Sequence, residues 1–196
     1  MTERARFEGM TEALVTWEEF IELPDDDRRE LIDGKLVEVE VPNGAHELLV
    51  ATLCYLLIAW ARPRKAGRVM ASGYKVRVGA HRGVMPDVQF FREDNPALGP
   101  ASATALESGR PDLAIEILSP GSARYDRVKK LNWYRSIGVP EYWIIDPEDR
   151  SLERFVLEGG RYVLRDALEE GDVMRSDTLE GLEIAVSELF ADVPSA

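Results

Sequence analysis

The spacing of apolar and polar residues predicts regular elements along most of the chain. A short helix is expected after Thr16, which has the features of a helix cap. Residues 30–41 alternate around Asp33-Gly34, a pair typical of a tight turn between antiparallel strands. Residues 46–61 are predominantly apolar and predict a long buried helix.

Beyond this helix the pattern alternates between short apolar strands and one further helix. The predicted elements are strands at 69–78, 84–91, 111–118 and 141–145, a helix at 123–137 that ends at Gly138, a hairpin at 151–164 and a short helix at 186–190. Residues 93–111 form a long connection that contains several prolines and glycines.

This order predicts an α/β fold with one mixed central sheet. From residue 45 to 146 the elements run helix, strand, strand, strand, helix, strand. The chain has no internal repeat and no recognisable linker, so we expect residues 1–196 to form a single domain. The N-terminal hairpin at 30–41 and the C-terminal hairpin at 151–164 are expected to extend or flank the sheet.

One acid interrupts an otherwise apolar strand. The segment 112–118 reads Asp-Leu-Ala-Ile-Glu-Ile-Leu, and the acid inside it is Glu116. Burying an ionised carboxylate is costly unless a cation or hydrogen-bond donors compensate it. The preceding strand opens on Asp87, directly after Pro86. If the two strands pair, the carboxylates of Asp87 and Glu116 converge, and hard cations such as Mg²⁺ favour such oxygen ligands.

The second long helix carries a lysine on its apolar side. Lys130, Trp133, Tyr134 and Ile137 follow the i, i+3, i+4, i+7 spacing of a single helix face. A lysine on that face needs a negative partner, and Asp126, one turn earlier, can supply one. The alternative is a lysine whose stem packs while its amine reaches solvent. Two strand carboxylates and a nearby lysine indicate a metal site that cuts phosphodiester bonds.

The net charge limits the kinds of molecule that the protein is expected to bind. The chain is 45% hydrophobic, and its charge of −12 argues against indiscriminate binding of nucleic acid. Residues 48–86 nevertheless contain seven bases and no acid. This stretch is either a surface that contacts phosphates or an ordinary solvated helix end and hairpin.

Three features favour a cytoplasmic protein without a membrane segment. The single cysteine, Cys54, excludes an internal disulfide and fits a reducing compartment. Residues 1–10 lack the apolar core of a signal peptide. The longest apolar run, at 48–61, has 14 residues and is shorter than the roughly 20 that span a bilayer.

Taken together, these residues resemble the core of a PD-(D/E)-x-K nuclease. Within that superfamily the chain resembles the family of Uma-two-like putative restriction endonucleases over about residues 16–190. The matching segments are Glu30-Leu31-Ile32-Asp33-Gly34, His46, Pro86-Asp87-Val88, Glu116-Ile117-Leu118-Ser119-Pro120, Tyr125-Asp126 with Lys130 and Tyr134, and residues 138–147.

The resemblance implies a role for each residue. Asp87 and Glu116 would ligate Mg²⁺ or Mn²⁺, with the backbone carbonyl of Ile117 as a third ligand. Lys130 would orient or activate the attacking water and stabilise the developing charge. In the superfamily the lysine usually stands two residues after the glutamate, where this chain has Leu118, so Lys130 must reach in from the helix. DNA as the substrate and a homodimer that cuts both strands are also expectations of the family.

Two further residues are secondary candidates. His46 stands at the start of the apolar helix and is a base, a second metal ligand, a phosphate contact or simply a histidine with a local hydrogen bond. Glu38 ends a strand and either approaches the metal or remains a solvated carboxylate.

Three functions therefore compete. The first is a metal-dependent DNA endonuclease. The second is an inactive relative that keeps the nuclease fold as a binding or assembly module. The third is another hydrolase, such as a glycosidase, that uses Asp87 and Glu116 as acid and base. Dependence on a metal separates the first from the third.

Overall fold

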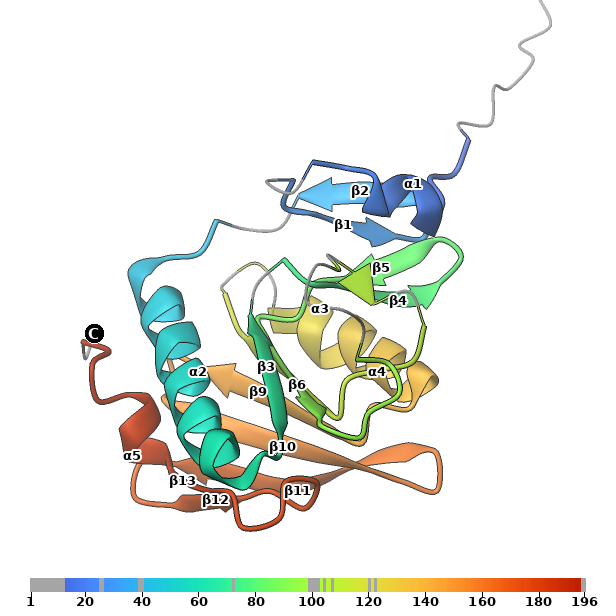
Figure 1. The fold of residues 1–196 in the computed structure, drawn as a ribbon. Helices are drawn as coiled ribbons and strands as arrows, with labels where there is room; N and C mark the ends of the chain where they lie inside the picture. Colours follow the sequence, from blue (N-terminus) through green and yellow to red (C-terminus); the bar gives the residue numbers. More distant parts are fainter. Residues whose placement is uncertain are drawn as a thin grey trace, which may run out of the picture.

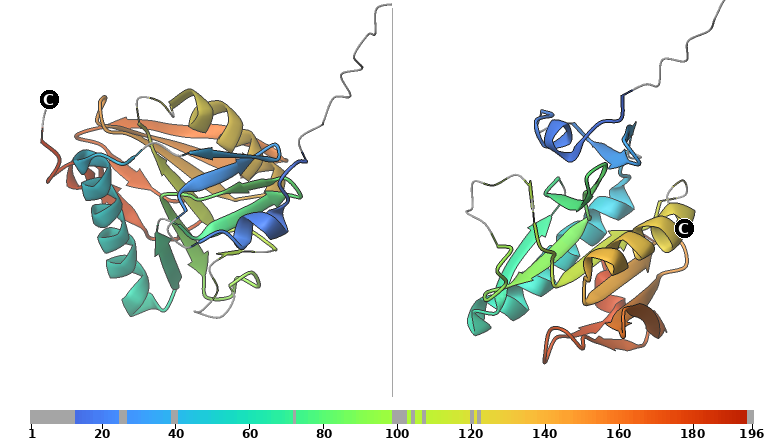
Figure 2. Two further views of the ribbon diagram at one scale, coloured as in Figure 1. Left: turned by 90° about the horizontal axis from the view of Figure 1, so that it is seen from above. Right: turned by 90° about the vertical axis from the view of Figure 1, so that its right-hand side faces the viewer.

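The computed structural model describes residues 13–24, 27–38, 41–71, 73–98, 103, 105–106, 108–119, 121 and 123–194. Two helices, α2 (Gly44–Arg64) and α4 (Leu131–Ile137), pack on opposite faces of a central six-stranded sheet (Figure 1). A second sheet carries the N-terminal hairpin, which lies with α1 (Trp17–Ile21) on one side of this core (Figure 2). The predicted α/β class with a mixed sheet is confirmed.

The central sheet contains the elements that the pattern predicts for the core. Its strands, in spatial order, are β11 (Arg161–Glu169), β10 (Ser151–Glu158), β9 (Glu141–Asp146), β8 (Leu113–Ile117), β6 (Val88–Arg92) and β3 (Gly67–Ala71). Neighbours are antiparallel except β8 and β9, which are parallel. In chain order α2, β3, β6, β8, the second long helix and β9 give the predicted helix-strand-strand-strand-helix-strand core.

The N-terminal hairpin flanks the central sheet as part of a separate one. This second sheet has the order β2 (Lys35–Glu38), β1 (Arg29–Ile32), β5 (Arg82–Val84), β4 (Lys75–Gly79) and β7 (Ala105–Leu106). Trp17 and Phe20 of α1 pack on Leu31 of β1 and form a small core of their own. Residues 39–40 of the predicted hairpin lie outside the described residues.

Two predicted strands were wrong as single elements. Residues 69–78 form both β3 and β4, and residues 84–91 form parts of both β5 and β6, so each stretch is divided between the two sheets. Gly73, which has a φ of +92°, lies at the first break, and Pro86 lies at the second. An alternating pattern gives the face of each residue but does not reveal where a chain leaves one sheet for another.

Helix α2 is longer than predicted. It begins after Asn43, whose side chain accepts a hydrogen bond from the backbone N–H of His46, and it ends at Lys65 in a left-handed conformation. Its length and composition would allow it to cross a membrane. Here one stripe of it, including Leu49, Leu53 and Leu57, is buried against the sheet.

The helix predicted at 123–137 contains an irregular turn. It consists of α3 (Ala123–Tyr125), a π-helical turn η1 (Asp126–Lys130) and α4, and it ends at Gly138 with a φ of +80° as predicted. The backbone N–H of Leu131 donates to the carbonyl of Asp126, which closes the wider turn. Such turns occur often at functional sites.

The C-terminal hairpin extends the central sheet. Its strands β10 and β11 turn at Gly159 and Gly160, and β11 continues to Glu169, beyond the predicted limit of residue 164. The chain ends with β12 (Val173–Arg175), β13 (Glu183–Ala185) and the predicted short helix, α5 (Val186–Leu189).

Candidate active site

The two predicted carboxylates lie at the same end of the central sheet. Val88 of β6 pairs with Ile115 of β8, and continuing this register by one residue places Asp87 opposite Glu116. The Oδ2 atom of Asp87 accepts a hydrogen bond of 2.8 Å from the backbone N–H of Ile117. The pairing of β6 with β8 thus brings together two residues that are 29 positions apart.

Glu116 is buried between two side chains of the second long helix. Its residue is only 2% exposed. The Nζ atom of Lys130 lies 3.0 Å from Oε2, and the hydroxyl of Tyr134 donates to Oε1 at 2.5 Å. Both carboxylate oxygens therefore have a protein donor.

Lys130 does not reach solvent, so the snorkelling alternative is wrong. Its side chain is 6% exposed, and its ammonium group lies among three carboxylates. The distances from Nζ are 3.0 Å to Glu116, 3.1 Å to Glu30 and 3.5 Å to Asp126. The predicted pairing with Asp126 is confirmed, and the π-helical turn η1 places both residues on the buried side.

Glu30 is the residue of this cluster that the sequence did not single out. It belongs to β1 in the second sheet, is 3% exposed, and accepts a hydrogen bond of 3.0 Å from the backbone N–H of Met85. One signal in the sequence could have identified Glu30 as a site residue. This residue belongs to the segment Glu30-Leu31-Ile32-Asp33-Gly34, which carries part of the family resemblance. Tyr134 was likewise noted only as part of an apolar stripe and of the segments that carry the resemblance.

The cluster contains more negative than positive charge. Burial raises the pKa of Glu116 well above its usual range, and although the nearby Lys130 charge opposes this shift, Asp87, Asp126 and Glu30 reinforce it. Burial lowers the pKa of Lys130, but Glu116, Glu30 and Asp126 outweigh it, so this pKa is raised well above the usual value. The ammonium group therefore stays protonated at neutral pH.

His46 reaches Asp87 from the start of α2. Its Nε2 atom lies 3.1 Å from Oδ1 of Asp87. Burial lowers the pKa of the imidazole, but the hydrogen bond and charge of Asp87, together with Glu47, raise it above its usual value. Within the described part of the chain, the buried Nδ1 atom has no hydrogen-bond partner. Asp87 is thus held from both sides, by His46 and by the N–H of Ile117.

Glu38 lies apart from this cluster. It is exposed at the end of β2, where it pairs in register with Arg29. Its approach to a metal stays a prediction, as does the use of the Ile117 carbonyl as a ligand.

The oxygen ligands available at this site are of the kind that a hard divalent cation prefers. Asp87 and Glu116 supply oxygen ligands, and the excess of carboxylates over cations leaves negative charge for a metal to neutralise. Asp126 also has a buried Oδ1 atom without a hydrogen-bond donor in the described structure. Among the described residues no group of three histidine, cysteine, aspartate or glutamate side chains is arranged to hold a metal. Mg²⁺ commonly uses only one or two carboxylates and keeps several waters.

The bases of residues 48–86 do not form a single group around these carboxylates. Arg62, Arg64, Lys65 and Arg68 lie around the C-terminal end of α2, whereas Lys75, Arg77 and Arg82 lie on β4 and β5. Arg64 is 18 residues beyond His46 in one helix, which corresponds to roughly 27 Å. The first group is therefore remote from the candidate site.

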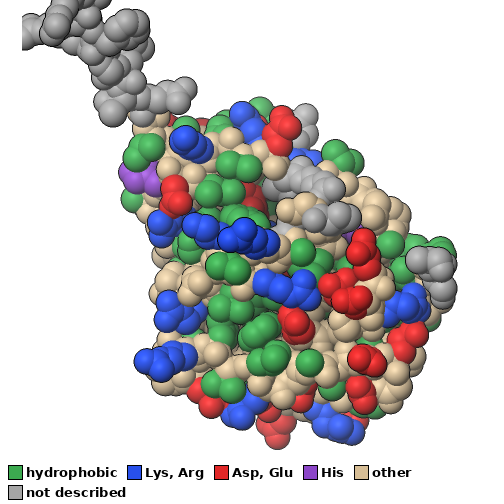
Figure 3. Space-filling model, turned by 180° about the vertical axis from the view of Figure 1, so that it is seen from behind, with side chains coloured by type: hydrophobic (Ala, Val, Ile, Leu, Met, Phe, Trp, Pro, Cys, Tyr) green, Lys and Arg blue, Asp and Glu red, His purple; other side chains and the backbone are tan. Residues whose placement is uncertain are grey.

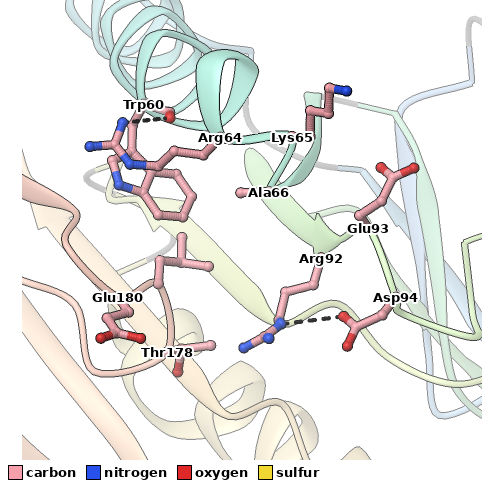
Figure 4. A pocket seen from close by; sticks show the side chains of 10 residues that line it. Trp60, Arg64, Lys65, Ala66, Arg92, Glu93, Asp94, Thr178 and Glu180 are labelled. Atoms are coloured by element: carbon pink, nitrogen blue, oxygen red, sulfur yellow. Dashed lines mark hydrogen bonds and ion pairs between the residues drawn. The ribbon is translucent and has the colours of Figure 1, made fainter.

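A cavity of about 460 Å³ lies at that remote end of α2 (Figure 4). It is lined by Trp60, Arg64, Lys65, Ala66, Arg92, Glu93, Asp94, Thr178, Leu179 and Glu180. Arg92 pairs with Asp94, so the charges of the lining partly cancel. On the rear face of the molecule, lysine and arginine side chains form a band among scattered acids (Figure 3).

Comparison with known proteins places the chain in a family. No curated protein matches it. A solved structure described as a putative nuclease belonging to DUF820, from Anabaena variabilis, superimposes with a TM-score of 0.75 at 20% sequence identity, covering 90% of this chain and 98% of that one. The type IIG restriction endonuclease BpuSI matches with a TM-score of 0.42 at 14% identity, over 80% of this chain and 17% of that one. The family model Uma2, described as putative restriction endonuclease, matches residues 17–187, so the chain belongs to the Uma2 family.

Proposed function

We propose that this protein is a metal-dependent endonuclease that hydrolyses phosphodiester bonds in DNA. The observation that carries the proposal is the buried Lys130–Glu116 pair, which lies beside Asp87 at one end of the central sheet. A protein that needed only stability at this place would gain as much from apolar side chains. Membership of a family described as restriction endonucleases supports DNA as the substrate.

Asp87 and Glu116 are the residues that would hold Mg²⁺ or Mn²⁺. When bound, such a cation neutralises charge on a phosphoryl oxygen and lowers the pKa of a water molecule. His46 and the N–H of Ile117 fix the carboxylate of Asp87, and Tyr134 fixes that of Glu116. The site is thus preorganised by hydrogen bonds from three separate elements.

Lys130 acts as a hydrogen-bond donor and a positive charge rather than as a base. Its raised pKa keeps the amine protonated at neutral pH, so it cannot accept a proton from water. An ammonium group at this place orients the attacking water and stabilises the negative charge that develops on phosphate. This role requires the ammonium group to be held at a fixed position.

An inactive module with a nuclease fold is the second candidate. The observation in its favour is that every carboxylate oxygen of Asp87 and Glu116 already has a protein partner, within the residues described. A cation would have to share these oxygens with their present partners, because each oxygen has one remaining lone pair. A homodimer and a cytoplasmic location stay predictions.

Calorimetric titration with Mg²⁺ and Mn²⁺ tests the proposal, with plasmid nicking assayed on the same samples with and without EDTA. Glu116→Ala is compared with Glu22→Ala, which removes an exposed glutamate directly after α1. We expect wild type and Glu22→Ala to bind the metal and nick DNA, and Glu116→Ala to lose both. Metal binding by a wild type that does not nick DNA would favour the inactive module. Nicking that survives EDTA would contradict metal dependence.

A further inference from the structure

Glu30 connects the two sheets at the candidate site. The side chain comes from the N-terminal hairpin, yet its Oε1 atom lies 3.1 Å from Nζ of Lys130, which is 100 residues later in the chain. Its neighbour Leu31 faces the small core of the second sheet, so strand alternation turns Glu30 toward the central one. The side chain is 4% exposed, which makes this contact a buried one.

The same oxygen atom of Glu30 also accepts the backbone N–H of Met85 at 3.0 Å. Met85 lies in the link between β5 and β6, two residues before Asp87. Pro86, whose φ angle is fixed by its ring, stands between them, so few free backbone torsions separate Met85 from Asp87. One carboxylate therefore contacts both the catalytic ammonium group and the segment that presents the first carboxylate.

We propose that Glu30 is a positioning residue of the active site, which sets the place of the Lys130 ammonium group relative to Asp87 and Glu116. This inference rests on the proposed nuclease function. Without Glu30, the ammonium group keeps Glu116 and Asp126 as partners and moves toward them. The segment before Asp87 loses its anchor at the same time, so the lysine and the aspartate are no longer held to each other.

The proposal gives the N-terminal hairpin a function. A hairpin that only protects the edge or the core of the molecule would need apolar residues, as Leu31 provides. The buried charge of Glu30 does not add stability in an obvious way, because a buried ion pair gains little over apolar packing. Its value lies in orientation: the ammonium group has three carboxylate neighbours from three different elements, which fix it in three directions.

The test compares Glu30→Gln and Glu30→Asp with Glu22→Gln, a control at an exposed glutamate directly after α1, the helix that packs on the same hairpin. Steady-state cleavage is measured together with the affinity for Mn²⁺ by calorimetry and with unfolding by urea. The ¹H–¹⁵N signal of the Lys130 ammonium group is recorded without metal. The chain has five lysines, so this signal is assigned by its loss in Lys130→Arg.

We expect Glu30→Gln to lower kcat at least tenfold, with KM and the Mn²⁺ affinity within twofold of wild type, and to shift the Lys130 signal. Glu30→Asp keeps the charge but is shorter by one methylene, so we expect kcat between those of wild type and Glu30→Gln. Glu22→Gln should change none of these quantities. Wild-type kcat in Glu30→Gln, or a fall that only follows a loss of folded protein, would overturn the proposal.

The NMR signal of Lys130 distinguishes a failure of this proposal from a failure of the proposed function. If wild type cleaves no DNA, the nuclease function fails, yet a Lys130 signal that shifts in Glu30→Gln still supports the positioning of the ammonium group by Glu30. An unchanged Lys130 signal in a folded Glu30→Gln protein would overturn the positioning role even if wild type is an active nuclease.

Discussion

Two clusters in this molecule each place one buried cation among three acids, and they are built differently. In the first, the Lys130 cluster, the acids are Glu30, Glu116 and Asp126, whose side chains are all at most 4% exposed. In the second, the Arg154 cluster, the acids are Glu141, Asp166 and Asp177.

The Arg154 cluster is closed by hydrogen bonds. Glu141 is fully buried, and its oxygens accept bonds from the indole of Trp143, the hydroxyl of Ser176 and the backbone N–H of Thr178. The side chains of Asp166 and Asp177 are 32% and 55% exposed, so water shares in their solvation. Such a network holds the C-terminal segment against β9 and β10 and leaves no group for further chemistry.

The Lys130 cluster keeps a surplus of negative charge away from water. The raised pKa of Glu116, caused first by burial, reflects that surplus. The Oδ1 atom of Asp126 has the ion pair with Lys130 at 3.5 Å but, in the described structure, no hydrogen bond. The comparison teaches that burial of charge alone does not mark a functional site. What marks the functional site here is buried negative charge that the protein compensates only in part, together with an irregular helical turn.

Removing the cation from each cluster should produce the largest contrast. We expect Lys130→Met to reduce cleavage at least 100-fold and to cost about 3–5 kcal/mol of unfolding free energy at pH 8, because three buried carboxylates lose their partner. Arg154→Met should cost about 2 kcal/mol or less and keep cleavage within twofold, since two of its acids reach water. Urea unfolding and plasmid nicking check both variants.

The loss of unfolding free energy in Lys130→Met should be smaller at pH 5 than at pH 8. Glu116 has a raised pKa in the folded protein, so it takes up a proton as the pH falls and no longer needs a cation. An equal loss at pH 8 and pH 5 would show that packing of the lysine stem, rather than charge, makes the difference.

Two tyrosine hydroxyls, one on α4 and one on β11, give a smaller contrast. Tyr134 donates to the buried carboxylate of Glu116, and Tyr162 donates to the backbone carbonyl of Val139. We expect Tyr134→Phe to cost about 1.5–3 kcal/mol and Tyr162→Phe about 0.5–1.5 kcal/mol, because a hydrogen bond to a charged group is the stronger. Urea unfolding at pH 8 measures both, and equal losses would indicate that Glu116 is protonated there.

The smallest effect should come from His46. Its pKa is raised in the folded protein, so its pairing with Asp87 stabilises the fold fully below the ordinary histidine pKa, and this stabilisation disappears as the pH rises through the raised value. His46→Gln should therefore cost about 1 kcal/mol at pH 5.5 and less at pH 9.

An NMR titration of the two histidines tests directly whether Asp87 raises the pKa of His46. The chain contains only His46 and His81. The pKa of His46 should lie above its usual value in wild type and fall in Asp87→Asn, where the negative charge is absent. A histidine that titrates normally in both proteins would contradict the pairing.

The sequence was informative about three of the central residues because each breaks a local pattern. Glu116 interrupts an apolar strand, Asp87 opens another after a proline, and Lys130 lies on the apolar side of a helix. Periodicity assigns a residue to a face of its own element, and a polar residue on a buried face needs a compensating partner. That argument predicted the neighbourhood of Glu116 and Lys130 but not how many groups share it.

The sequence did not reveal the division of two strands between sheets, the π-helical turn or the contact of Glu30 with Lys130. These features depend on where whole elements pack, and no local pattern records a contact between residues 100 positions apart. By itself the sequence therefore determined most of the elements and the faces that they bury. It also indicated that Asp87, Glu116 and Lys130 lie close together. Only the tertiary structure decided that the N-terminal sheet adds a third carboxylate, because closing that long loop is favourable only when the two sheets dock as units.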